Sequence, residues 1–194
     1  YKDGEWKESY LGLSDPERGL KTESGLIYDL ASVSKVVGVG TVLTFLWQQG
    51  KLDIDIPVTD FLSECDYPDI TIRQLLTHAT DLDPFIPNRD KLSAEELREA
   101  MFHLNRRNQP AFLYSDVHFL LLGFVLEKIF NQDLDQIIKK QVLEPWGMKE
   151  TQFGPIEQAV PTVKGVEVGI IHDPKARLLG KHAGSAGLFS TVKD

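Results

Sequence analysis

The feature that most constrains the fold is an apolar segment at residues 33–49, which begins directly after a serine. Its apolar residues recur with helical spacing, so we expect a helix that is buried on most sides. Gly38 and Gly40 would each cost about 1 kcal/mol against alanine in an exposed helix. Their presence indicates close packing against neighbouring elements. Gly50 is a natural end for this helix.

The start of this segment carries Ser32 and Lys35, three residues apart. Residues at this spacing lie on one face of a helix, so the serine Oγ and the lysine Nζ come within hydrogen-bond reach. A serine hydroxyl needs such a base to act as a nucleophile, and burial of the lysine disfavours its charged form. The backbone N–H of Ser32, at the helix start, is free to bind an oxyanion. Many solvated helix starts share this four-residue pattern, so it does not identify a site alone.

A second polar group stands before another apolar helix, expected at residues 117–130. Tyr114 precedes this helix, and its phenolic oxygen could carry a proton between Ser32 and a leaving group. The presence of this tyrosine favours the interpretation of Ser32 and Lys35 as catalytic residues.

Extended segments are expected at both ends of the chain. Turn residues at 14–19 separate stretches that include Trp6 and Leu13 on one side and residues 26–28 on the other, which predicts a hairpin. Residues 180–194 are expected to form a loop and then an extended segment.

The middle of the chain is expected to be mainly helical. The expected helices are a short one capped by Thr71, one that opens with a capping box at Ser93 and runs to about Arg107, and one over residues 134–143 that Pro145 ends. Arg106 and Arg107 would form a solvated helix end.

Charge and composition exclude several classes of function. The formal net charge of −8 argues against nucleic-acid binding, which needs clustered lysines and arginines. The single cysteine, Cys65, rules out an intramolecular disulfide and has no neighbouring base in the sequence. No stretch of about 18 apolar residues predicts a membrane-spanning helix.

The histidines are weighed mainly as structural residues. His78 is expected to be structural rather than catalytic. His118 is expected to have a surface or packing role, although it could line a cleft. His172, Asp173 and His182 raise the idea of a metal site, but their spacing matches no metal-binding motif. Neither a metal nor an organic cofactor is expected.

Six segments, in order along the chain, resemble motifs of the serine β-lactamase and DD-peptidase superfamily. They cover residues 31–35, 52–62, 72–78, 114–116, 145–153 and 186–191. The likeness is closest to the class C branch, with its DD-carboxypeptidases and β-lactamase-like esterases. The resemblance implies Ser32, Lys35 and Tyr114 as catalytic residues and Asp116 as a substrate-binding residue.

The resemblance also implies a fold and a reaction. The fold is α+β, with a mainly helical part and the N-terminal part of an antiparallel sheet, and with the C-terminal sheet strands missing. Residues 1–194 would form one incomplete domain: 1–50 the hairpin and nucleophile helix, 51–160 the mainly helical part, and 161–194 the return toward the sheet. The reaction is acyl transfer through an acyl-Ser32 intermediate on a β-lactam, a D-Ala-D-Ala peptide or a small ester.

Two departures from the family pattern matter. Asp116 stands where the family has an asparagine that donates to the substrate's amide carbonyl, and an ionised aspartate can only accept. This disfavours classical penicillin turnover and favours an esterase or peptidase. The third motif, a lysine or histidine followed by Thr-Gly, is absent, and the chain is expected to stop before it.

The alternative function is a non-catalytic family member that acts in binding or regulation. The sequence that follows Asp194 in the gene would separate the two, because the third motif there would favour an enzyme. Expected partners are a small molecule or a peptidoglycan peptide. The resemblance alone favours a location outside the cytoplasm, and the oligomeric state is left open.

Overall fold

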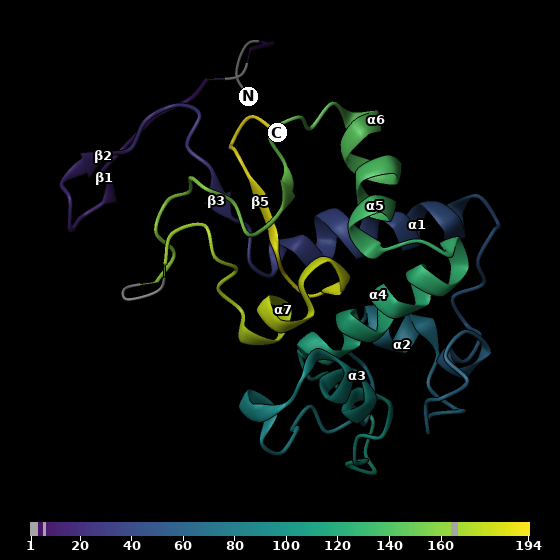
Figure 1. The fold of residues 1–194 in the computed structure, drawn as a ribbon. Helices are drawn as coiled ribbons and strands as arrows, with labels where there is room; N and C mark the ends of the chain where they lie inside the picture. The colour runs from purple at the N-terminus through teal and green to yellow at the C-terminus, as the bar shows by residue number, and fades with distance from the viewer. Residues whose placement is uncertain (1–3, 6, 164–166) are drawn as a thin grey trace.

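The computed structural model describes residues 4–5, 7–163 and 167–194 of the 194-residue chain. A small antiparallel sheet joins the two ends of the chain, with β5 (Leu188–Ser190) between β3 (Tyr28–Asp29) and β4 (Gln152–Phe153). Tyr28 pairs with Ser190, and Phe153 pairs with Leu188. All three residues of β5 are buried, and this strand is the central one of the sheet (Figure 1).

A hairpin forms in this region, with β1 (Leu13–Asp15) paired to β2 (Leu20–Lys21). Residues 26–28, expected as its second strand, do not belong to it, because Tyr28 lies in β3 and pairs with β5. The Asp15 carboxylate accepts hydrogen bonds from the backbone N–H groups of Glu17 and Arg18, which fixes the turn. The hairpin lies to one side of the sheet in Figure 1. Trp6, expected in the same extended region, lies outside the described residues.

The central element is α4 (Asp116–Phe130), which is buried at every position from 117 to 126. Its N-terminus is capped by Ser115, whose hydroxyl accepts from the N–H of Val117, and Asn131 ends it in the left-handed conformation. Both α2 (Ile72–Leu76) and α5 (Leu134–Ile138) pack against this helix (Figure 1). The helix therefore forms the core around which the helical part is built.

The segment after Ser32 forms a π-helix, η1 (Lys35–Gly40), which continues as α1 (Thr41–Gln48). A Cβ at Gly38 would lie 2.8 Å from Cδ1 of Ile138, which confirms the close packing expected there. The expectation that this helix is buried on most sides is wrong. Val36 is 69% exposed and Trp47 is 50% exposed. The helix packs on α4 and the sheet through one face only, and its other face meets solvent.

Two predicted helix ends are wrong. The helix that opens at Ser93 is α3 (Ala94–Phe102), which ends well before Arg107, because the chain there turns back to pair with Leu82. Pro145 does not stop its helix: α5 continues through η4 (Lys139–Leu143) into α6 (Glu144–Trp146), and the proline lies in the first turn of α6. The helix ends instead at Gly147, whose φ is 70°.

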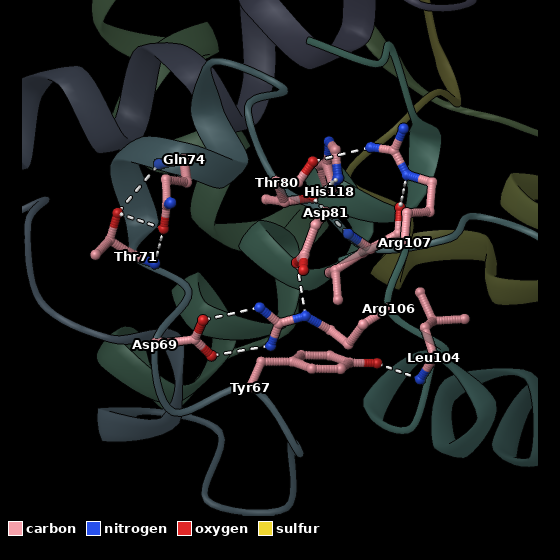
Figure 2. Close-up of polar contacts among 11 residues, drawn as sticks. Tyr67, Asp69, Thr71, Gln74, Thr80, Asp81, Leu104, Arg106, Arg107 and His118 are labelled. Atoms are coloured by element: carbon pink, nitrogen blue, oxygen red, sulfur yellow. Dashed lines mark hydrogen bonds and ion pairs between the residues drawn. The ribbon is translucent and has the colours of Figure 1, made fainter. Parts of the chain in front are cut away.

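The remaining helical segments are short. They are η2 (Val58–Asp60), η3 (Arg89–Lys91), α7 (Pro174–Leu179) and η5 (Gly180–His182). The capping box that Thr71 makes with Gln74 at the start of α2 confirms the expected cap (Figure 2). Among the described residues, no helix combines the length and the apolar character needed to cross a lipid bilayer.

Arg106 and Arg107 do not form a solvated helix end. Arg106 makes a two-pronged contact with Asp69, at 2.9 and 2.8 Å, and a 2.6 Å ion pair with Asp81. Arg107 donates to the backbone carbonyls of Thr80 and Leu82 (Figure 2). The two arginines therefore hold the segment around residues 80–82 in place beneath α4.

Gly184 provides a test of how tightly the segment before β5 packs against α4. A Cβ at this position would overlap the carbonyl oxygen of Phe119 and lie 3.1 Å from Cγ2 of Val39. We expect Gly184→Ala to lower the free energy of unfolding by about 3 kcal/mol, because backbone would have to move. Urea denaturation followed by circular dichroism measures this change. Gln48→Ala, at an exposed position, is the control and should change it by less than about 0.5 kcal/mol; a loss below about 1 kcal/mol in Gly184→Ala would contradict the packing argument.

Candidate active site

Ser32 lies on the tight turn that links β3 to η1, with its side chain exposed to solvent. The residue before it, Ala31, has a φ of 45°, a left-handed conformation that costs free energy in a residue other than glycine. The Asp29 carboxylate accepts from the N–H of Ala31 at 2.8 Å and holds this conformation. The N–H of Lys35 donates to the Ser32 carbonyl at 3.1 Å, which closes the turn.

The Ser32 backbone N–H donates no hydrogen bond within the part of the chain that the structure describes. An N–H with this freedom, beside an exposed hydroxyl, can donate to an oxyanion that forms on a carbon attacked by that hydroxyl. The expectation that the helix leaves this group unused agrees with the geometry, and its role as an oxyanion donor stays a prediction.

Lys35 is almost completely buried and makes three polar contacts through Nζ. The distance from Nζ is 3.0 Å to Oγ of Ser32, 2.8 Å to Oδ1 of Asp116 and 2.8 Å to the carbonyl oxygen of Ser185. An ammonium group has three donors, so these contacts use its full capacity. The structure thus brings Ser32, Lys35 and Asp116 together, as the sequence spacing and the resemblance predict.

Asp116, at the first position of α4, contacts a second lysine that the sequence does not point to. Nζ of Lys175, on α7, lies 3.1 Å from Oδ2 of Asp116. Burial opposes ionisation of Asp116, but the hydrogen bond and charge of Lys35, together with Lys175, lower its pKa below the ordinary value. Asp116 is therefore an ionised bridge between two amines.

Tyr114 contacts Lys35 through its ring. Its hydroxyl makes no hydrogen bond among the described residues. Nζ of Lys35 lies 5.1 Å from the ring centroid, a cation–π distance. Half of the Tyr114 side chain is exposed, so a substrate could reach the phenol. Its role as a proton carrier to Ser32 stays a prediction.

His78 and His118 form a buried polar chain behind Tyr114. The two Nδ1 atoms lie 2.9 Å apart. Nε2 of His118 lies 2.8 Å from Oγ1 of Thr80 (Figure 2). Burial lowers the pKa of His78, as does the charge of Lys35, although Asp116 opposes this. Burial also lowers the pKa of His118 to about 4, aided by His78 and Arg107. Both rings are therefore neutral at pH 7, and the packing role expected for them agrees with their burial.

Three residues near the end of α4 offer ligand atoms close together: Glu127, Asp133 and His182. His182 already pairs with Glu127, and Lys181 with Asp133. Arg98 also lies 3.6 Å from Glu127. These partners occupy the carboxylates, so the group forms a network of hydrogen bonds and ion pairs. His172 and Asp173 do not belong to it.

Cys65 is buried, and its pKa is raised to about 12 by that burial and by the neighbouring acidic residues. A thiol in this state supplies almost no thiolate at neutral pH. The structure therefore agrees with the view that Cys65 is not a nucleophile.

Comparison with known proteins identifies the family of this chain. The Beta-lactamase family model matches residues 1–194. This chain belongs to the Beta-lactamase family. A relative from Escherichia coli K12, named "Putative D-alanyl-D-alanine carboxypeptidase", is 28% identical over 96% of this chain and 53% of its own length. The chain thus spans about half the length of the curated relatives it matches.

Two solved structures show the same fold. A "Beta-Lactamase/D-Alanine Carboxypeptidase" from Pseudomonas syringae has a TM-score of 0.74 at 16% identity, covering 95% of this chain and 53% of its own. A class C β-lactamase from Rhodobacter sphaeroides has a TM-score of 0.70 at 21% identity, covering 95% and 53%. The expected α+β fold of the β-lactamase type, with the helical part dominant, is confirmed.

The buried histidine chain makes stability depend on pH. Unfolded His118 takes up a proton as the pH falls below about 6.5, whereas the folded protein keeps it neutral down to a pKa of about 4. The unfolded state then binds more protons, so the free energy of unfolding should fall between pH 6.5 and pH 4, by up to about 3 kcal/mol from this residue. Urea titrations at several pH values measure the slope. His118→Gln should flatten it and the exposed His172→Gln should not; equal slopes in the two variants would refute the assignment.

Proposed function

We propose that the gene product carrying this chain is a serine hydrolase of the penicillin-recognising type, which acts through an acyl-Ser32 intermediate. The observation that carries the proposal is the 3.0 Å contact between Nζ of Lys35 and the exposed Ser32 hydroxyl, with the amine fixed from behind by Asp116 and Ser185. Membership of the Beta-lactamase family and the names of its relatives support the same reaction class.

The proposed steps follow from these positions. For Lys35 to act as the base, its ammonium must first release one proton to solvent; the neutral amine then accepts the proton of Oγ of Ser32 as that oxygen attacks the substrate carbonyl. The oxyanion that forms accepts a hydrogen bond from the Ser32 N–H. Tyr114 and Lys35 return a proton to the leaving group, whose departure leaves the acyl group on Ser32. Water or an amine then attacks the acyl-enzyme, which releases the product and restores the serine.

The proposed substrates are amides and esters, namely a D-Ala-D-Ala peptide, a β-lactam or a small ester. A cleft of about 320 Å³ opens beside Lys175, between residues 89–97 and α7, and Leu92, Leu97 and Leu178 line it together with charged residues. Such a cleft fits a substrate group with an apolar body and a polar end. Asp116 accepts and does not donate, which favours esters and peptides over penicillins. A cell-wall peptide as partner, outside the cytoplasm, belongs to the same proposal.

The nucleophile is tested by intact-mass analysis of the complete gene product after exposure to a fluorescent penicillin or an activated ester. We expect one acyl adduct, and at least a 1,000-fold slower acylation in Ser32→Ala, because no other group replaces the nucleophile. Ser63→Ala, which removes an exposed serine far along the chain, is the matched control and should acylate normally. No adduct, or one that survives in Ser32→Ala, would favour the binding or regulatory alternative.

Asp116→Asn tests whether this carboxylate sets the preference for substrates. The amide supplies a donor that a carboxylate lacks, and one such hydrogen bond is worth about 1 kcal/mol. We therefore expect the acylation rate with penicillin, divided by the rate with an activated ester, to rise about five- to tenfold.

Asp60→Asn is the control for this comparison. It makes the same change of carboxylate to amide at an exposed position that makes no contact with Lys35 among the described residues, so the ratio of the two rates should stay within about twofold. An unchanged or lower ratio in Asp116→Asn would contradict the proposed role of the carboxylate.

A further inference from the structure

The segment that carries Tyr114 is held on both sides by one residue. The N–H of Leu113 donates to the backbone carbonyl of His78 at 2.9 Å, and the N–H of Ser115 donates to Nδ1 of the same histidine at 3.3 Å. The His78 ring also packs against the Tyr114 ring, with centroids 4.7 Å apart. Backbone, side-chain nitrogen and ring of a single residue thus define where Tyr114 lies.

The direction of each hydrogen bond follows from these contacts. A backbone N–H can only donate, so Nδ1 of His78 is an acceptor. The proton between the two Nδ1 atoms therefore belongs to His118, and its Nε2 accepts from the hydroxyl of Thr80. That hydroxyl oxygen in turn accepts from the N–H of Leu82 at 3.2 Å. In this assignment Nδ1 of His78 accepts from two donors, the N–H of Ser115 and Nδ1–H of His118, and both rings are neutral.

The far end of this chain is anchored away from the site. Arg107 donates to the carbonyls of Thr80 and Leu82, and this arrangement is visible in Figure 2. His78 itself has a φ of 55°, a conformation that is uncommon outside glycine and asparagine. Such a conformation persists only where the surroundings hold it, and it is what directs both the carbonyl and the ring of His78 toward residues 113–115.

Among the described residues, the titratable groups that face His78 are Lys35, Tyr114, Asp116 and His118. The positive charge of Lys35 disfavours a second one on the histidine, and Asp116 opposes this only partly. A protonated Nδ1 could accept from neither Ser115 nor His118, so the arrangement depends on the neutral form.

We propose that His78 is a positioning residue, which holds the backbone and the ring of Tyr114 so that this ring lies against Nζ of Lys35. The proposal rests on the proposed function for the part that concerns rate. It makes no claim that His78 touches substrate. Because a displacement of about 1 Å at a reacting group can cost about 100-fold in rate, loss of this support should lower the rate of the chemical step.

Two substitutions at His78 can adopt its positive φ. They therefore separate the loss of support for Tyr114 from an effect of backbone strain. His78→Gly removes the ring and the acceptor, and His78→Asn keeps an acceptor near the position of Nδ1. In the complete gene product we expect His78→Gly to lower the acylation rate constant about 10- to 100-fold with little change in the concentration for half-saturation. His78→Asn should recover most of the rate.

A double-mutant cycle with Tyr114→Phe tests whether the effect passes through the phenol. If His78 acts through Tyr114, His78→Gly should cost less than about threefold in the Tyr114→Phe background. Equal losses in both backgrounds would overturn the proposal, as would an asparagine variant no faster than the glycine variant, because either result describes general structural damage.

A measurement that needs no activity keeps this proposal separate from the proposed function. With 3-fluorotyrosine at position 114, the ¹⁹F spectrum should show one dispersed signal in the parent and in His78→Asn, and a signal moved toward the unfolded position in His78→Gly. An unmoved signal in His78→Gly would refute the positioning role. The expected spectra without any adduct on Ser32 would refute the proposed function alone.

Discussion

The buried amine of Lys35 is the interaction on which the rest of the site depends. A lysine that is removed from water must have its charge and its donors satisfied, or the fold loses several kcal/mol. The three partners of Nζ come from distant parts of the chain: Ser32 before η1, Asp116 at the start of α4, and the carbonyl of Ser185 before β5. The sheet, the nucleophile turn and the central helix are therefore located by one side chain.

The close packing of backbone on backbone serves this arrangement. Gly184 lies against Phe119 in the middle of α4, and Gly123 faces Gly184 at the same contact. This approach brings the carbonyl of Ser185 within 2.8 Å of the amine. The two glycines thus allow the backbone at residue 184 to approach α4 more closely than larger residues would permit. The same approach forms the polar contact with Lys35 and part of the apolar core.

Local patterns in the sequence predicted what local forces decide. The spacing of Ser32 and Lys35, the caps at Thr71 and Ser93, and the apolar helix after Asp116 all depend on residues within one or two turns, and each is confirmed. The family motifs added the long-range step of bringing Asp116 to Lys35.

What the sequence did not predict depends on tertiary contacts. Lys175 stands in no motif, and only the fold of α7 onto α4 brings it to Asp116. The end of α3 and the environment of Arg106 depend on chain pairing near residue 82, which no local pattern records. The pairing of His78 with His118 joins residues 40 positions apart. The apolar context of His78 predicted a structural role but gave no partner, and the expectation for His118 left a surface position open although this residue is buried.

The left-handed conformation of Ala31 restricts how this part of the chain can change over evolutionary time. Glycine at position 31 would relieve the local strain, but it would also let the turn explore other conformations and loosen the hold on Ser32. A valine or isoleucine would be excluded, because a branched Cβ is poorly tolerated at positive φ. Alanine is a compromise, since it tolerates the conformation at a modest cost and still limits the turn. Selection for greater stability at this one position would therefore act against a well-defined nucleophile.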